Sequence, residues 1–132
     1  MITVHLTGAK FLPRTVDAER LCDAVLDVGE QLGIDRKVRV EVRPWASNTQ
    51  GLAIARKRGT GTIVLYDKAI RRWAGYTRTT HIRSYSVTLA HELVHLSQEA
   101  RGSKALTLAV AEREADRLEA VYGPEVERWL RG

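Results

Sequence analysis

The spacing of apolar residues divides this sequence into strand-like and helix-like segments, and the order of these segments limits the folds open to it. Residues 2–7 alternate between apolar and polar side chains, which predicts a half-buried strand. Over residues 15–32 apolar side chains recur at spacings of three and four, which predicts a helix that is capped by Thr15 and ends at Gly33.

Three further strands are predicted in the middle of the chain. In segment 38–42 valines alternate with charged residues, and Pro44 disfavours continuation beyond it. Segment 52–55 is a short apolar run, and residues 56–59 after it have the composition of a turn. Residues 62–66 are rich in β-branched and aromatic side chains, which makes them the most strand-like part of the sequence.

The remaining residues are mostly helical in pattern. We expect helices over four ranges: 67–73, from Ser84 or Ser86 to 100, 103–122, and 125–130. Gly102 would separate the second range from the third, and Gly123 with Pro124 would end the third. This order of elements indicates an α+β fold in which a small sheet packs on helices. The length of 132 residues is that of one domain, so we expect a single domain over residues 1–132.

The cysteine count and the N-terminal residues bear on the compartment. Cys22 is the single cysteine, so no internal disulfide can form, which favours a reducing environment. The first seven residues carry no positive side chain and no long apolar stretch, so we expect no signal peptide. No apolar run approaches membrane-spanning length. We therefore expect a cytoplasmic protein without a membrane partner, and we expect it to be a monomer.

The segment His91-Glu92-Leu93-Val94-His95 carries the residues most suited to chemistry. Its two histidines lie four positions apart on a predicted helix, which brings both imidazoles to one face, one turn apart. Two imidazoles placed in this way can bind one Zn²⁺ ion. Glu92 projects to one side of the pair, where its carboxylate can reach a water molecule at an open metal position and act as general base. The segment therefore predicts one catalytic zinc ion.

A catalytic zinc ion usually takes three protein ligands and one water molecule, so a third ligand is needed. No histidine follows His95, which leaves the upstream His5 and His81 or a downstream carboxylate. Glu112 is the favoured candidate, because a helix that folds back antiparallel would bring it over the histidine pair. Glu114 is the competing carboxylate, although it faces another side of that helix when Glu112 points inward.

Asp116 would assist the zinc ligands rather than bind the metal itself. It lies four residues after Glu112 and shares its helix face. From there it would accept a hydrogen bond from the outer ring nitrogen of a zinc-binding histidine, which fixes the tautomer of that ring.

These motifs resemble those of a known group of enzymes. His91-Glu92-x-x-His95 followed by Glu112-x-x-x-Asp116 resembles the gluzincin pattern of zinc metallopeptidases. The longer run Thr88-Leu89-Ala90-His91-Glu92-Leu93-x-His95, with Glu112-x-Glu114-Ala115-Asp116, is similar to the small ImmA/IrrE-like peptidases and the minigluzincins. The resemblance implies a minimal zincin fold, in which a small mixed β-sheet packs on an active-site helix and on a C-terminal helix that supplies the glutamate.

The resemblance also implies an activity, that of a zinc-dependent metalloendopeptidase acting on a protein or peptide. Zinc would activate a water molecule and polarise the scissile carbonyl, and Glu92 would move the proton from that water to the leaving amine. In such peptidases an edge strand pairs with the extended substrate, and the matching strand here consists of Leu52, Ala53, Ile54 and Ala55. A donor to the oxyanion is also needed, and the candidates are His81, Tyr76, Tyr85 and Tyr122.

An uneven charge distribution supports an alternative function. The net charge is +5, and residues 34–83 hold twelve Lys/Arg against three Asp/Glu. This basic segment could contact nucleic acid or a partner protein, although no nucleic-acid-binding motif accompanies it. The alternative is a catalytically silent regulatory or binding module that keeps the zinc fold. An intact Glu92 argues against it, because a structural zinc site needs no general base.

Overall fold

A computed structural model describes residues 1–45, 48–55, 60–100 and 107–132. These residues form the strands β1 (Thr3–Thr7), β2 (Lys37–Arg43), β3 (Gly51–Ala55) and β4 (Gly61–Tyr66), and the helices α1 (Ala18–Gln31), α2 (Asp67–Thr77), α3 (His81–Ala100) and α4 (Leu108–Arg131). The fold is α+β, and its elements follow one another in the order that the sequence predicts. Within the described ranges no helix is both long and apolar enough to cross a membrane.

The sheet is mixed, with the strand order β1-β2-β4-β3. The strands β1, β2 and β4 run parallel, whereas β3 is antiparallel to β4. Helix α1 forms the crossover that a parallel pair such as β1 and β2 requires. Among the described strands β3 has a neighbour on one side only, so its outer edge is available for pairing.

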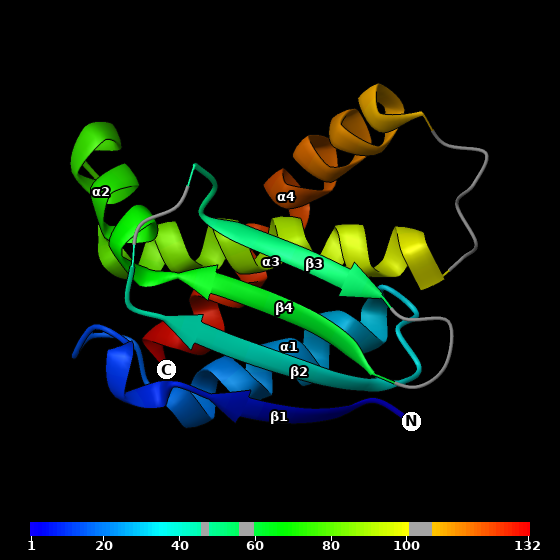
Figure 1. Ribbon diagram of the computed structural model, residues 1–132, viewed down its shortest axis with the longest axis horizontal. Coiled ribbons are helices and arrows are strands. Elements are labelled where there is room, and N and C mark those ends of the chain that lie inside the picture. Colours follow the sequence, from blue (N-terminus) through cyan, green and yellow to red (C-terminus); the bar gives the residue numbers. More distant parts are fainter. Residues whose placement is uncertain (46–47, 56–59, 101–106) are drawn as a thin grey trace.

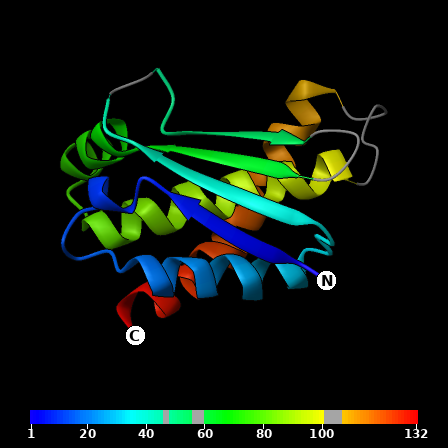
Figure 2. The same ribbon diagram turned by 60° about the horizontal axis from the view of Figure 1, so that its bottom comes forward.

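Side chains of the sheet alternate between a covered face and an open face. Val38, Val40 and Val42 of β2 are buried under the helices, whereas the intervening Lys37 and Arg39 are exposed on the open face. Helices α1 and α3 contact the sheet on the covered side, and α4 packs across both of these helices (Figures 1 and 2). The period-two alternation in the sequence therefore decides which face receives the helices.

Helix α3 is the central element, because both the sheet and α4 pack against it. Its apolar side chains between Leu89 and Leu96 are fully buried, and several polar side chains of the helix are buried with them: Ser84, Ser86, Thr88, Glu92, Ser97 and Gln98. Burial of a polar group is costly unless a hydrogen bond compensates for it. No fully buried side-chain nitrogen or oxygen in the described part of the chain lacks a hydrogen-bond partner. The polar residues of α3 are thus placed for specific contacts.

Several helix boundaries differ from the prediction. The cap of α1 is Asp17 rather than Thr15, because the Asp17 carboxylate accepts a hydrogen bond from a backbone N–H of the first turn at 2.9 Å. Helix α2 continues past residue 73 and stops where Arg78 adopts a left-handed φ of 53°. Helix α3 begins earlier than predicted, at His81, since the Thr80 hydroxyl caps its first turn.

Helix α4 runs through Gly123 and Pro124, so the predicted end there and the separate helix over 125–130 are wrong. A proline within a helix costs roughly 3 kcal/mol. Beyond it Val126 and Leu130 are buried in the core, and burial of each stabilises the helix by roughly 1.5–3 kcal/mol. Core packing therefore outweighs the lost hydrogen bond. The predicted turn at 56–59, the break at Gly102 and the helix start at 103 lie outside the described residues.

Candidate metal centre

His91 and His95 lie on one face of α3, one helical turn apart. Their rings meet edge to face with centroids 4.7 Å apart, and their Nε2 atoms are separated by 3.1 Å. Leu89, Leu93 and Leu96 on the other faces of the helix are fully buried in the core. This burial fixes the rotation of α3, so the two imidazoles lie side by side away from the core, as the four-residue spacing predicts.

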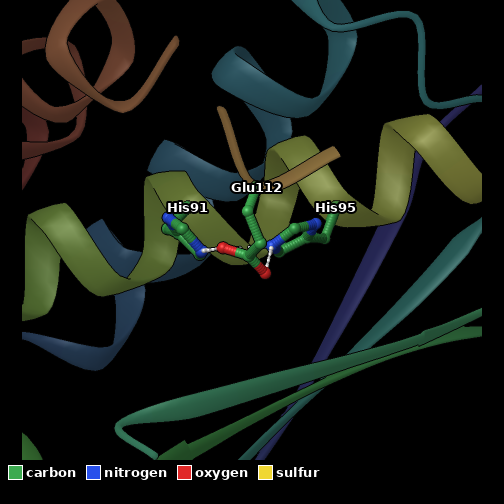
Figure 3. A group of neighbouring side chains, drawn as sticks. All are labelled: His91, His95 and Glu112. Atoms are coloured by element: carbon green, nitrogen blue, oxygen red, sulfur yellow. Dashed lines mark hydrogen bonds and ion pairs between the residues drawn. The ribbon is translucent and has the colours of Figure 1, made fainter. Parts of the chain in front are cut away.

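Glu112 approaches the histidine pair from α4 (Figure 3). Its Oε2 atom lies 3.3 Å from Nε2 of His91, and its Oε1 atom lies 3.0 Å from Nε2 of His95. The three side chains each offer one ligand atom, and these atoms lie within 4.8 Å of one another. One carboxylate from a neighbouring helix therefore faces both imidazole nitrogens at once.

Hydrogen bonds at the outer ring nitrogens fix the tautomer of each histidine. Nδ1 of His91 lies 3.1 Å from Oε1 of Glu119, and Nδ1 of His95 lies 2.9 Å from Oε1 of Gln98. Both partners are acceptors, so each Nδ1 donates its hydrogen and each neutral ring keeps a lone pair on Nε2. Two nitrogen lone pairs and the carboxylate of Glu112 therefore converge on one point.

This convergence is unfavourable unless a positive charge lies between the three groups. The shift in the pKa of His91 also indicates that the site favours a positive charge. The hydrogen bond to Glu119 raises the pKa of His91 despite the opposing effect of burial, and the carboxylates of Glu92 and Glu112 raise it further. A proton or a metal cation at the point of convergence would relieve the repulsion.

The donor set fits zinc. Zinc binds imidazole nitrogen and carboxylate oxygen at about 2.0–2.2 Å in tetrahedral geometry, which places two ligand atoms about 3.3 Å apart. The two Nε2 atoms lie 3.1 Å apart, and each lies 3.0 or 3.3 Å from the nearer of the two Glu112 oxygens, so these separations are close to that value. Three protein ligands leave a fourth position open for water or substrate, which is typical of catalytic zinc sites and not of structural ones.

Glu92 lies beside the histidines, on the wall of a cleft that opens over them, and its residue is 7% exposed. Burial raises the pKa of its carboxyl, and the neighbouring histidines partly oppose this shift. Gly51, at the start of β3, packs directly on it. A Cβ atom at Gly51 would lie 2.9 Å from Cγ of Glu92 and 3.1 Å from Cγ2 of Thr88. The missing side chain at Gly51 thus lets the edge strand lie close to the carboxylate.

A cleft of about 700 Å³ opens over the three ligands, between the edge strand and α4. Leu52 and Ala53 of β3 line one wall, and Leu108 and Ala111 of α4 line the other. The volume is within the usual range for a small-ligand pocket, about 300–1,000 Å³. The predicted substrate strand therefore borders the candidate metal ligands.

Glu119 takes the role that the sequence assigns to Asp116. The Asp116 carboxylate lies 3.7 Å from Nδ1 of His91, too far for a hydrogen bond, and its side chain is 71% exposed. Glu119 lies one turn further along α4 and is 3.1 Å from the same nitrogen. The expected hydrogen bond at His91 is thus present, and its acceptor is a residue that the sequence reasoning missed.

The structure separates Glu112 from the other candidates for the third ligand. Glu114 faces Gln98, whose Nε2 atom lies 3.3 Å from Oε1 of Glu114. His5 lies on β1, at the opposite edge of the sheet from β3. His81 begins α3, ten residues before His91 and so about 15 Å away along the helix. Only Glu112 of these four reaches both imidazoles.

None of the four candidate oxyanion donors lines the cleft. Tyr85 is fully buried and donates its hydroxyl hydrogen to Asp67, and His81 lies at the far end of α3. Tyr76 is exposed on α2, and Tyr122 packs against the hydrophobic core. The structure therefore brings none of these four side chains into the cleft.

The basic segment 34–83 contributes no arginine or lysine to the cleft within the described residues. On the open face of the sheet Arg39 and Arg43 both pair with Glu41, at 3.9 and 2.9 Å. On α2 the Arg71 guanidinium pairs with Asp67 at 2.8 Å. Part of the positive charge is thus balanced locally, and its contact with a partner remains a prediction.

Comparison with known proteins assigns no family to this chain. No protein-family model matches it, and neither a curated protein nor a solved structure matches it. The resemblance to gluzincins therefore rests on the motif residues, and the case for a function rests on the geometry in which α3 and α4 present them.

Proposed function

We propose that this chain is a zinc-dependent metalloendopeptidase of the gluzincin kind. The proposal is carried by the convergence of ligand atoms from His91, His95 and Glu112 beside the buried carboxylate of Glu92. A structural zinc site normally takes four protein ligands and does not need an adjacent base. Three ligands, an open position and a carboxylate within one cleft favour hydrolysis.

Different residues of the chain have different roles in the proposed reaction. A bound zinc ion supplies Lewis acidity, which polarises the scissile carbonyl and makes water a better nucleophile. Glu92 accepts a proton from the attacking water and delivers it to the leaving amine. Its burial supports this role, because a carboxyl with a raised pKa is a stronger base near neutral pH. Glu119 and Gln98 keep the Nε2 lone pairs of the histidines free for the metal.

The strand β3 is proposed to hold the substrate in an extended conformation. It is an edge strand that borders the cleft, and a polypeptide can pair with such an edge through backbone hydrogen bonds. The strand residues concerned are Leu52, Ala53, Ile54 and Ala55. Leu52 and Ile54 are each 42% exposed on the open face, so an apolar substrate side chain could contact them.

The first test is metal content. Protein purified without chelator or added metal is expected to contain about one zinc ion per chain by elemental analysis. Zinc at a hundredfold excess over its Kd should stabilise the fold by about 2.7 kcal/mol, which raises the Tm by roughly 8–12 °C relative to chelator-treated protein. Absence of zinc after reconstitution, together with an unchanged Tm, would contradict the proposal.

The second test is activity on a defined set of molecules. Zinc-loaded protein should cleave internal bonds of a peptide library, with the new termini identified by mass spectrometry. Chelation should stop the cleavage and added zinc should restore it. A protein that binds zinc and leaves every peptide and protein substrate intact would support the alternative of a silent binding module.

Substitution of Gly51 by alanine is expected to reduce hydrolysis about tenfold or more. The added Cβ would lie 2.9 Å from Cγ of Glu92 and 3.2 Å from the Val64 carbonyl oxygen, so the carboxylate or the strand must shift. A displacement of about 1 Å can cost up to 10²-fold in rate. Gly75→Ala is the matched control, because nothing beyond its chain neighbours and its own helix backbone lies within 4 Å of the Cβ position at Gly75. Equal kcat/KM values for Gly51→Ala and the control would refute the role of Gly51.

A further inference from the structure

Gln98 makes three hydrogen bonds from a buried position at the metal centre. It lies on α3, three residues after His95, and is 2% exposed. Its Oε1 atom accepts from Nδ1 of His95 at 2.9 Å. Its Nε2 group donates to the backbone carbonyl of Ala111 at 2.9 Å and to the carboxylate of Glu114 at 3.3 Å.

The two ends of this amide cannot be exchanged. Nε2 faces a carbonyl and a carboxylate, which only accept, so the oxygen of Gln98 must face His95. The Nδ1 atom of His95 must then carry the hydrogen, and Nε2 presents its lone pair to Glu112. One side chain on the same helix therefore fixes the tautomer of one proposed zinc ligand.

The other end of the amide acts on a second ligand. The carbonyl of Ala111 belongs to the peptide bond that joins it to Glu112, so the contact holds the backbone directly before that carboxylate. Helix α4 begins at Leu108, so this contact lies in its first turns. Gln98 thus links the helix that bears the histidines to the start of the helix that bears the glutamate.

We propose that Gln98 is a positioning residue that sets the geometry of two zinc ligands at once, His95 through its tautomer and Glu112 through its backbone. The proposal rests on the zinc site of the proposed function, but not on peptide hydrolysis. A buried amide is costly where it lacks partners, and an apolar side chain would fill the same space more cheaply. Two of its three partners, the His95 ring and the Ala111 carbonyl, lead directly to a proposed ligand, which a purely structural role does not require.

The test is the affinity for Zn²⁺, measured by competition with a chromophoric chelator. Gln98→Met keeps the length of the side chain and removes all three hydrogen bonds. We expect its Kd for zinc to rise by about 10–100-fold, the usual effect of losing a hydrogen-bond partner of a ligand. With Co²⁺ in place of zinc, we expect the visible absorption bands to shift or lose intensity, which a mere loss of stability would not cause.

Gln31→Met is the matched control. Gln31 also joins two helices through its Nε2 group, which lies 3.1 Å from Asp27 of α1 and 2.8 Å from Glu125 of α4. It does not line the cleft. This variant should lose a similar interhelical contact and retain the zinc Kd and the cobalt spectrum of the wild type. Equal zinc affinities of the Gln98→Met and Gln31→Met proteins would overturn the proposal.

Gln98→Glu tests the contact with His95 separately from the contact with the Ala111 carbonyl. It also replaces the methionine variant if that protein fails to fold. Its carboxylate still accepts from His95 but cannot donate to the Ala111 carbonyl, so we expect a Kd between those of the wild type and Gln98→Met. A Kd as weak as that of the methionine variant would overturn the role at His95. Weakened zinc binding in a protein without peptidase activity would support the role of Gln98 and refute the proposed enzyme. Absence of zinc from the wild type would overturn both.

Discussion

The Glu92→Gln variant is expected to retain one zinc ion per chain and to lose peptide hydrolysis by a factor of about 10²–10⁴. An amide of the same shape cannot accept the proton of the attacking water. The metal ligands are His91, His95 and Glu112 in the proposed site, and the substitution leaves all three in place. Elemental analysis and initial rates on the best peptide substrate would measure the two effects separately.

Glu99→Gln provides the comparison for this result. Glu99 lines the same cleft and stands on the same helix, so the variant removes one negative charge without removing the proposed base. Its rate should stay within about tenfold of the wild type, since it loses only an electrostatic contribution of a partly exposed group. A Glu92→Gln protein with more than a tenth of the wild-type rate would show that Glu92 is not the general base.

The Glu92→Gln substitution is also expected to keep or raise the stability of the metal-free protein. Burial raises the folded-state pKa of Glu92 above its ordinary value of 4.5. The ionised carboxylate therefore destabilises the folded state, and the loss grows as the pH rises above that value. Glutamine carries no charge at this position. Thermal denaturation with a chelator at pH 7 should give Glu92→Gln a Tm at or above that of the wild type.

The sequence predicts the strands and the order of elements well, because these depend on local spacing. Alternation in 2–7 and 38–42 decides which side chains can be buried, and β1 and β2 follow it. The course of α4 through Pro124 depends instead on Val126 and Leu130 reaching a core built from distant segments. Local signals at Gly123 and Pro124 therefore predict an end that tertiary packing overrides.

The sequence predicts the proposed zinc ligands for the same reason. The spacing of His91 and His95 decides their common face, and Glu112 needs only a helix that packs back on α3. The choice between Asp116 and Glu119 depends on a small rotation of α4 about its axis, because residues 112, 116 and 119 share one face. The sequence places Glu119 on this face, but nothing in it favours Glu119 over Asp116 as the acceptor for His91.

Gln98, Gly51 and the tyrosines depend on contacts that no local spacing reveals. Gln98 meets Ala111 only once α4 is in place, and Gly51 meets Glu92 only once β3 lies at the sheet edge. Tyr85 follows the helical pattern of α3, but its face turns into the core. The spacing of residues in the sequence indicates candidate ligands more readily than the residues that orient them, because orientation depends on how the elements pack against one another.

The Glu112→Ala variant is expected to bind zinc on the order of 10²–10³-fold more weakly than the wild type. Four-ligand zinc sites bind with about 10–16 kcal/mol, or about 2.5–4 kcal/mol for each ligand. Glu112 contributes a carboxylate that faces both imidazoles, at 3.0 and 3.3 Å. Arg113→Ala is the control, because it truncates an exposed side chain on the same turn of α4 and should leave the Kd unchanged.

The zinc affinity of a Glu114→Ala variant would test which face of α4 is turned toward the histidines. Successive helical residues lie about 100° apart, so Glu112 and Glu114 point in directions about 160° apart and cannot both face the histidines. Loss of affinity in Glu112→Ala with less than tenfold loss in Glu114→Ala agrees with the structure, where Glu114 contacts Gln98. The opposite result would require α4 to be rotated by nearly half a turn. Such a rotation would expose Ala115, which is fully buried. The identity of the third ligand therefore also tests the packing of α4.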